Sequence, residues 1–139
     1  MTTASFTGSG TAEDPWTLST PPGKSTYQAH RDEGSDPPAV VVQVSSTQLR
    51  YHLRAITDLH EMLTAHGDWM ALGNADEHKP APEGSVEAWA RSADNPVGGW
   101  YGLKKGLRGR FGNYVPPILE ALGLAEVEHN ARNNRMRAL

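Results

Sequence analysis

The sequence contains no cysteine, which excludes disulfide bonds, thiolate metal sites and thiol catalysis. It also lacks any run of about 18 apolar residues, the shortest length that usually spans a membrane as a helix. Residues 1–14 carry neither a basic start nor an apolar stretch, so the sequence predicts no secretory signal. We therefore expect a cytoplasmic protein that does not bind a membrane.

Its length of 139 residues is that of one domain with one hydrophobic core. Residues 1–14 are rich in Thr, Ser and Gly, and we expect this stretch to be disordered. The remaining residues, 15–139, are predicted to form a single α+β domain. Within it we expect a sheet and a helix over 15–72, a Pro-rich polar loop over 73–84 and a basic part over 85–139.

The first part of the domain has the pattern of antiparallel strands. Strands over Trp16–Thr20 and Ser25–His30 would flank a Pro-Pro-Gly turn. Val40–Val44 is rich in β-branched residues, and apolar and polar residues alternate in Thr47–Leu53. The sequence therefore predicts an N-terminal antiparallel sheet of three to four strands.

A change of period after this sheet predicts helices. Ile56, Leu59 and Leu63 recur at helical spacing, and Gly67 can end the helix that they indicate. After the polar loop, Ser85 can cap a further short helix.

The segment Val97–Phe111 combines glycines with aromatic and basic residues. On a helical wheel, its apolar, basic and glycine residues fall on three separate stripes. We predict a helix from about Pro96 to Leu107, with a glycine face that could approach another backbone closely. Because each interior glycine costs about 0.8–1 kcal/mol relative to alanine, a loop remains the alternative.

The C-terminal segment has a clearer pattern of a helix, a glycine stop and a hairpin. A helix can begin at Pro116, since proline is tolerated in the first turn, and it can end at Gly123. The stretches Ala125–His129 and Arg135–Leu139 then alternate like paired strands around the polar tip 130–134.

Charge is divided unevenly along the chain. Residues 1–90 hold five Lys/Arg and twelve Asp/Glu, a net charge of −7, whereas residues 91–139 hold eight Lys/Arg and four Asp/Glu, a net charge of +4. A basic end of this kind attracts polyanions, so we predict sequence-tolerant binding to DNA or RNA through it. The predicted nucleic-acid-binding residues are seven cations and one tyrosine: Lys104, Lys105, Arg108, Arg110, Arg132, Arg135, Arg137 and Tyr101.

The stretch Trp100–Leu139 resembles the second half of a winged helix-turn-helix domain of MarR-like regulators. The likeness lies in the run Leu119-Glu-Ala-Leu-Gly-Leu-Ala-Glu-Val-Glu-His-Asn-Ala-Arg-Asn-Asn-Arg-Met-Arg-Ala-Leu139. The resemblance implies a recognition helix followed by a β-hairpin wing. It also implies that Arg132 is the cation at the wing tip, with Arg135 and Arg137 on the returning strand.

The whole chain also resembles a family of small bacterial proteins without an assigned activity. The likeness lies in the run Pro96-Val-Gly-Gly-Trp-Tyr-Gly-Leu-Lys-Lys-Gly106, which recurs in that family. This second resemblance implies no mechanism.

Two other classes of function fit the same sequence. In the first, the acidic half or an exposed surface of Trp69, Trp89 and Trp100 docks a protein partner or a second copy, which would give a homodimer. In the second, the chain is a small enzyme or a ligand-binding protein with a dispersed site of histidines and carboxylates.

The second alternative requires a deep pocket that gathers His30, His52 or His60 with carboxylates. No nucleophile elbow, zincin helix or paired carboxylate motif occurs, so catalysis is not predicted, although dispersed active sites leave no local pattern. The sequence assigns no catalytic residue, no metal ligand and no cofactor.

Overall fold

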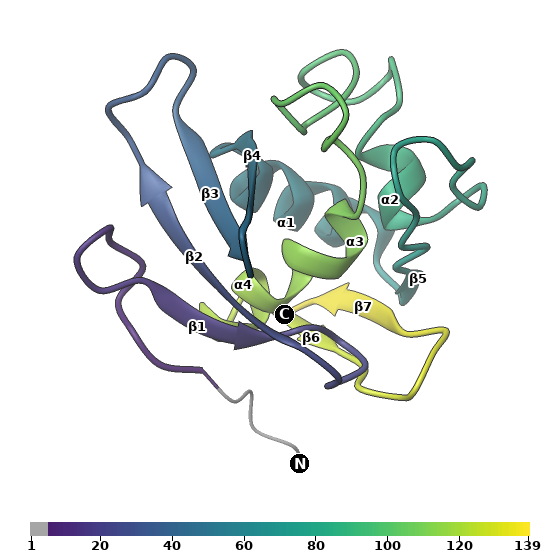
Figure 1. The fold of residues 1–139 in the computed structure, drawn as a ribbon. Helices are drawn as coiled ribbons and strands as arrows, with labels where there is room; N and C mark the ends of the chain where they lie inside the picture. The colour runs from purple at the N-terminus through teal and green to yellow at the C-terminus, as the bar shows by residue number, and fades with distance from the viewer. Residues whose placement is uncertain (1–5) are drawn as a thin grey trace.

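The computed structural model describes residues 6–139. These residues form a four-stranded antiparallel sheet, a set of helices, and a second, three-stranded sheet (Figure 1). The α+β class predicted from the sequence is therefore confirmed. Within this range, no helix combines the length and the apolar character needed to cross a lipid bilayer.

The first sheet consists of β1 (Trp16–Ser19), β2 (Thr26–Asp32), β3 (Ala39–Val44) and β4 (Thr47–His52), in the order β1-β2-β3-β4. Alternate residues of β1 are buried, and Leu49 and Tyr51 of β4 face the core as the apolar–polar alternation predicts. A two-residue turn joins β3 to β4, and Ser45 in it has a left-handed φ of 53°. The predicted sheet of three to four strands is confirmed with four.

Residues 6–14 are the described part of the stretch 1–14 that the sequence predicts to be disordered. Residues 6–14 form a turn against the first sheet, in which the main-chain carbonyl of Asp14 accepts hydrogen bonds from three N–H groups earlier in the turn. An isolated β-bridge also joins this stretch to β1. The small polar residues here serve a hydrogen-bonded turn, and residues 1–5 lie outside the described residues.

Helix α1 (Ala55–His66) follows β4 directly and buries Ile56, Leu59 and Leu63. Gly67 ends it in a left-handed conformation, with φ of 74°, and its N–H donates to the carbonyl of Leu63. The predicted apolar face and the predicted glycine stop are both confirmed.

Between α1 and the C-terminal helices the chain forms only β5 (Met70–Ala71) and α2 (Val86–Trp89). The Ser85 hydroxyl accepts a hydrogen bond from the N–H of Ala88 at 3.1 Å, which confirms the predicted cap.

Glu87 of α2 organises the irregular segments around it and is only 1% exposed. Its carboxylate accepts hydrogen bonds from the main-chain N–H of Gly112 at 2.9 Å and of Ala75 at 3.4 Å. The guanidinium of Arg91 binds it at 3.1 Å. Burial raises the pKa of Glu87, and these partners offset part of that effect. The loop after β5 and the start of the C-terminal helices are thus fixed to one buried group.

The predicted helix over Pro96–Leu107 is wrong, because this segment is an irregular loop. The side-chain oxygen of Asn95 accepts hydrogen bonds from three consecutive N–H groups, those of residues 97–99, at 3.0–3.2 Å. Residues 101–103 then run along the free edge of β4 and exchange main-chain hydrogen bonds with it. We call residues 96–110 the Gly-rich loop.

Two glycines of the Gly-rich loop are required by close backbone contacts. A Cβ atom on Gly102 would collide with the main chain of Arg108, and one on Gly109 would collide with the main chain at Asp76 and Glu77. The glycine spacing that suggested a helix face therefore reflects two separate close approaches in a loop.

The C-terminal pattern is confirmed. After α3 (Phe111–Tyr114), helix α4 (Pro116–Ala121) begins at the proline pair. Gly123 is left-handed, with φ of 75°, and the N–H of Leu124 folds back onto the carbonyl of Leu119 at 2.9 Å.

Strands β6 (Ala125–Val127) and β7 (Arg135–Ala138) then form the predicted hairpin. Strand β5 pairs with the other edge of β7, so that the second sheet has the order β5-β7-β6.

The helices cover one face of the first sheet (Figure 1). In this view, the second sheet lies below the helices and packs against them. One hydrophobic core joins the first sheet, the helices and the second sheet. Two buried tyrosines tie the first sheet to the C-terminal half: Tyr27 donates to the carbonyl of Tyr114 at 2.6 Å, and Tyr51 donates to the carbonyl of Gly109 at 2.8 Å.

The expected winged helix-turn-helix is not supported. The Gly-rich loop that leads into α3 contains no helix, and α3 and α4 have only four and six residues. The residues Pro116–Leu119 of α4 are buried in the core, so α4 presents no face that could enter a DNA groove. The likeness came from the order of a short helix, a glycine stop and a hairpin, which the structure does contain.

Candidate ligand-binding groove

Three of the seven predicted nucleic-acid-binding cations are bound by carboxylates of the protein itself. The first is Arg108, whose Nε donates to Glu77 at 2.7 Å. Glu77 also accepts hydrogen bonds from the main-chain N–H groups of Arg108 and Gly106. The Arg108 guanidinium, together with these N–H groups, lowers the pKa of Glu77 to about 2. Arg108 is therefore a structural partner of the Gly-rich loop.

The second and third are Arg135 and Arg137 on β7. Each is paired at 2.8 Å with a carboxylate of the neighbouring chain segment, Arg135 with Glu128 and Arg137 with Glu126. Both guanidinium groups also lie over the ring of Trp69, at 5.1 and 4.6 Å from its centroid. The outer face of the second sheet is thus a set of neutralised pairs.

The other four cations, Lys104, Lys105, Arg110 and Arg132, are exposed and make no ion pair with any residue of 6–139. They do not share one surface. The Gly-rich loop lies at the top of Figure 1, in green, whereas the hairpin tip with Arg132 lies at the lower right, in yellow. The predicted single basic surface does not form.

Tyr101 is wrongly predicted as a nucleic-acid contact, because it is fully buried. Its hydroxyl donates to Asp58 at 2.8 Å, and its ring stacks on Trp89 with centroids 4.9 Å apart. A side chain in this position cannot stack on a base.

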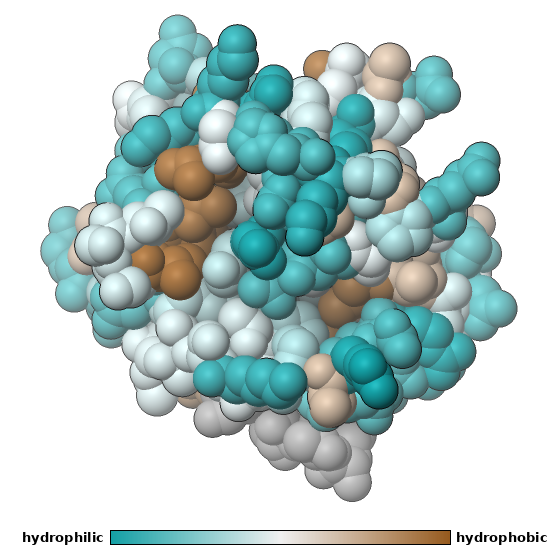
Figure 2. All heavy atoms as spheres, turned by 45° about the vertical axis from the view of Figure 1, so that its right-hand side comes forward, coloured by the Kyte–Doolittle hydropathy of each residue, from teal (hydrophilic) through white to brown (hydrophobic). Residues whose placement is uncertain are grey.

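The tryptophans expected on an interaction surface are half-buried instead. Trp100 lies between the guanidinium groups of Arg91 and Arg108, at 4.4 and 4.5 Å, and Trp69 is covered as described above. Figure 2 shows a largely hydrophilic face on which apolar side chains appear only in small, separate patches. The described residues thus present no tryptophan-rich surface for a protein partner.

A groove lies where β4 ends and α1 begins, with a volume of about 750 Å³. We call it the His52–Arg54 groove, and the residues used to define it are Pro37, Pro38, His52, Arg54, Pro96 and Val97. Its walls come from three segments far apart in the sequence: the β2–β3 connection, the β4–α1 junction and the start of the Gly-rich loop. Most of this lining is apolar, and its charged group is Arg54.

Arg54 is positioned by a buried network behind the groove. Its Nε donates to Asp58 Oδ2 at 2.7 Å, and the hydroxyl of Tyr101 donates to the same oxygen at 2.8 Å. The side chain of Asp58 is only 8% exposed, whereas that of Arg54 is 55% exposed. Because the carboxylate engages Nε, the terminal NH₂ groups of Arg54 are left to bind an anion in the groove.

His52 is the second polar group of the groove. Burial, and then the charge of Arg54, lower the pKa of His52, so that its imidazole is neutral at neutral pH. The ring meets that of Tyr101 edge to face, with centroids 6.1 Å apart. A neutral imidazole offers one hydrogen-bond donor and one acceptor.

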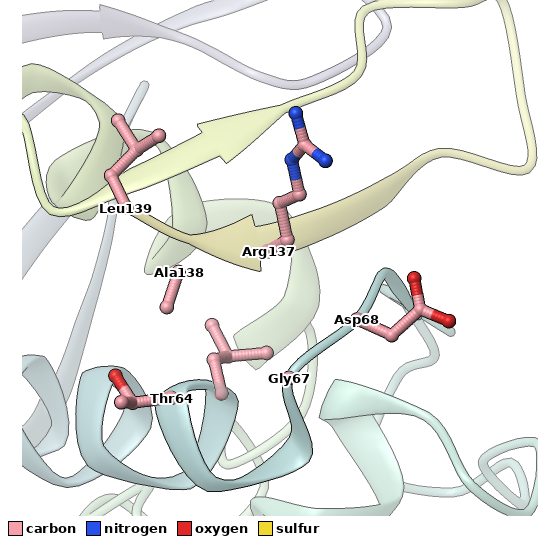
Figure 3. Close-up of a pocket in the computed structure, with 7 residues that line it drawn as sticks. Thr64, Gly67, Asp68, Arg137, Ala138 and Leu139 are labelled. Carbon is pink, nitrogen blue, oxygen red and sulfur yellow. The ribbon is translucent and has the colours of Figure 1, made fainter.

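A smaller hollow between α1 and β7 has a volume of about 330 Å³. Figure 3 shows Arg137 pointing from β7 away from α1, and Asp68 pointing outward after the end of α1. This hollow therefore gathers no convergent polar groups. Within residues 6–139, no three His, Asp or Glu side chains lie close enough together to hold a metal ion.

A comparison with protein-family models matches residues 8–139 to a family of unknown function, DUF6855. The chain belongs to this family. The uncharacterised family expected from the sequence is thereby confirmed, whereas a bacterial source is not shown. Neither the curated proteins nor the solved structures give a match. The function of this DUF6855 member must therefore be argued from its geometry.

Sequence reasoning named His52 only as one of three histidines for a dispersed site, and it missed Arg54 as a functional residue. One local signal existed: Arg54 and Asp58 are four residues apart at the start of a predicted helix, a spacing that favours an ion pair. Nothing local indicated that Pro37 and Pro96 would close the groove. That juxtaposition depends on the path of the Gly-rich loop.

Proposed function

We propose that this DUF6855 protein binds a small molecule with a carboxylate group and an apolar body in the His52–Arg54 groove. The observation that carries the proposal is the pairing of one fixed, partly exposed guanidinium with a lining that is otherwise mostly proline and aliphatic. Ligand sites commonly combine apolar walls with a few convergent polar groups, in volumes of about 300–1,000 Å³.

The carboxylate is assigned to Arg54 for a geometric reason. Because Asp58 binds its Nε, the guanidinium is held in one orientation and its two terminal NH₂ groups form a preorganised pair of donors. Such a pair matches two carboxylate oxygens, and the ordering of the arginine side chain is already achieved in the free protein. A neutral amide of the same shape would lose the charge-assisted part of this contact.

The apolar body is assigned to the proline-rich walls. Pro37, Pro38 and Pro96 present rigid ring surfaces, and Val97 adds an aliphatic contact. Because proline side chains have little conformational freedom to lose, packing against them has a low entropic cost. Neutral His52 can donate to or accept from a further polar atom of the ligand.

Phenylacetate and phenylacetamide form the matched probe pair for this proposal. We expect phenylacetate to bind about tenfold more tightly than phenylacetamide, as measured by saturation-transfer NMR and isothermal titration. The substitution Arg54→Gln should abolish this preference, whereas Lys24→Gln, which removes an exposed cation from the β1–β2 turn, should leave it unchanged. Equal affinity for the two probes, or an unchanged preference in Arg54→Gln, would contradict the proposal.

We propose as a second function weak, sequence-tolerant binding of DNA or RNA by the Gly-rich loop alone. What favours it is that Lys104, Lys105 and Arg110 are exposed and unpaired within residues 6–139, on a loop that Glu77 holds in place. Three phosphate contacts would make the affinity for duplex DNA fall about 40-fold between 50 and 200 mM salt.

The test of this second function is a titration of labelled duplex at low salt. The double substitution Lys104→Gln/Lys105→Gln should weaken binding, and the control Lys24→Gln/Lys79→Gln, which removes two other exposed lysines, should not. If both double variants bind equally well, or the wild type does not bind at low salt, the second proposal fails.

A further inference from the structure

A second cleft lies between the hairpin tip of the second sheet and the loop that follows β5. We call it the asparagine cleft, and its defining residues are Pro21, Pro22, Asn74, Asn113, Arg132 and Asn133. Its volume is about 620 Å³, within the usual range of small-molecule sites, and it shares no lining residue with the His52–Arg54 groove. It is therefore an independent candidate site.

Three amide side chains of the asparagine cleft are available to a ligand. Those of Asn74, Asn113 and Asn133 make no hydrogen bond with any residue of 6–139, although all three line the cleft. Asn134 differs, because its side-chain oxygen accepts from the N–H of Asn130 at 2.6 Å and its NH₂ donates to the carbonyl of the same residue at 3.0 Å. Asn134 thus fixes the hairpin tip, and the other amides remain free.

The asparagine cleft is also positively charged. Arg132 is exposed at the hairpin tip and pairs with no carboxylate of residues 6–139. The other arginine in the lining, Arg135, is already neutralised by Glu128. No Asp or Glu side chain of the described residues lines the cleft. The cleft therefore suits a ligand with an anionic group beside a neutral, hydrogen-bonding part.

We infer that the asparagine cleft binds an adenine nucleotide of the nucleoside monophosphate type. An asparagine amide can pair with the N6 and N7 atoms of adenine through one donor and one acceptor, and a guanidinium is suited to a terminal phosphate. The half-buried Pro22 supplies an apolar surface against which the planar base packs. Arg132 binds the phosphate, and two or more of the three free amides bind the base and the ribose hydroxyls.

The test compares AMP, adenosine and inorganic phosphate on the ¹⁵N-labelled full chain, followed by amide chemical shifts. We expect AMP to shift the amides of the hairpin tip and of Asn113, and to bind at least about tenfold more tightly than either part alone. Arg132→Gln should weaken the binding of AMP about tenfold and leave the affinity for adenosine unchanged. The matched control, Lys79→Gln, removes an exposed cation that does not line the cleft and should change neither affinity.

The double substitution Asn74→Ala/Asn113→Ala should weaken the binding of AMP and of adenosine by the same factor. It should not unfold the protein, because these side chains make no hydrogen bond with other residues of 6–139. A 5′-phosphorylated adenylate tetramer distinguishes a free nucleotide from an RNA end. Four results would each overturn the inference: phosphate binding as tightly as AMP, equal effects of Arg132→Gln and Lys79→Gln on AMP binding, tighter binding of the tetramer than of AMP, or shifts outside the cleft.

Discussion

Replacing Tyr101 by phenylalanine removes one hydroxyl from the network that positions Arg54. The hydroxyl is buried and donates at 2.8 Å to Asp58, whose side chain is 8% exposed. Phenylalanine keeps the ring contact with Trp89, so no cavity of side-chain size forms. The loss is therefore that of one hydrogen bond to a poorly hydrated carboxylate.

The magnitude follows from the charge of the acceptor. Hydrogen bonds to charged groups contribute about 1.5–3 kcal/mol, whereas bonds between neutral groups contribute about 0.5–1.5 kcal/mol. For a chain of 139 residues, a loss of about 1.5–3 kcal/mol lowers the melting temperature by about 5–10 °C. We expect Tyr101→Phe to be destabilised by this amount in urea unfolding and calorimetry.

Tyr27→Phe is the matched control. Tyr27 is also buried, and its hydroxyl donates to a neutral acceptor, the carbonyl of Tyr114, at 2.6 Å. It should lose only about 0.5–1.5 kcal/mol. If Tyr101→Phe proves no less stable than Tyr27→Phe, Asp58 is not the desolvated, charged centre that the network requires, and the preorganisation of Arg54 has lost its basis.

Two further predictions concern pH. Both ring nitrogens of His129 face oxygen acceptors, the carbonyl of Pro21 at 2.9 Å and the carboxylate of Glu120 at 2.6 Å. Burial lowers the pKa of His129, but the two hydrogen bonds have a larger effect in the opposite direction and raise the pKa above 6.5. A raised pKa means that protonated His129 stabilises the fold at a pH below the ordinary histidine pKa, and that this stabilisation is lost as the pH rises through the pKa of the folded state. The difference in unfolding free energy between wild type and His129→Gln should therefore be larger at pH 5.5 than at pH 9. An equal difference at the two pH values would refute the charged contact. The Arg108 guanidinium lowers the pKa of Glu77 to about 2, so Glu77→Gln should cost stability at neutral pH, and the gap in urea unfolding should shrink as the pH falls from about 4.5 towards 2. A gap that stays constant over that range would show that the pairing contributes nothing.

The elements that could be predicted from the sequence are those fixed by local chemistry. The spacing of Leu59 and Leu63 with the stop at Gly67 defined α1, and the proline pair with Gly123 defined α4. Each of these signals acts within one or two turns of the chain. The hairpin followed from alternation around a polar tip in the same way.

The Gly-rich loop could not be predicted from its own pattern, because its conformation depends on distant partners. Gly109 approaches the backbone at Glu77, and residues 101–103 pair with β4 some fifty residues earlier in the chain. The helical-wheel stripes were coincidental. One local signal favoured a loop, since Asn95 precedes a proline, and an Asn-Pro pair is typical of turns.

The candidate sites depend on the same long-range contacts. Arg108 was predicted as a free cation because its partner Glu77 lies 31 residues earlier, where no pattern links the two. The His52–Arg54 groove joins segments near residues 37, 54 and 96. Composition indicates which charges exist, but only the fold decides which of them are neutralised.

Binding of a carboxylate ligand in the groove at the β4–α1 junction is the core of the proposed function. Amide chemical-shift mapping of the ¹⁵N-labelled protein during a phenylacetate titration tests it most directly. We predict that the shifts concentrate at His52, Thr57 and Val97, all of which line the groove, and disappear in Arg54→Gln. Shifts spread over the surface, or unchanged in that variant, would contradict the claim.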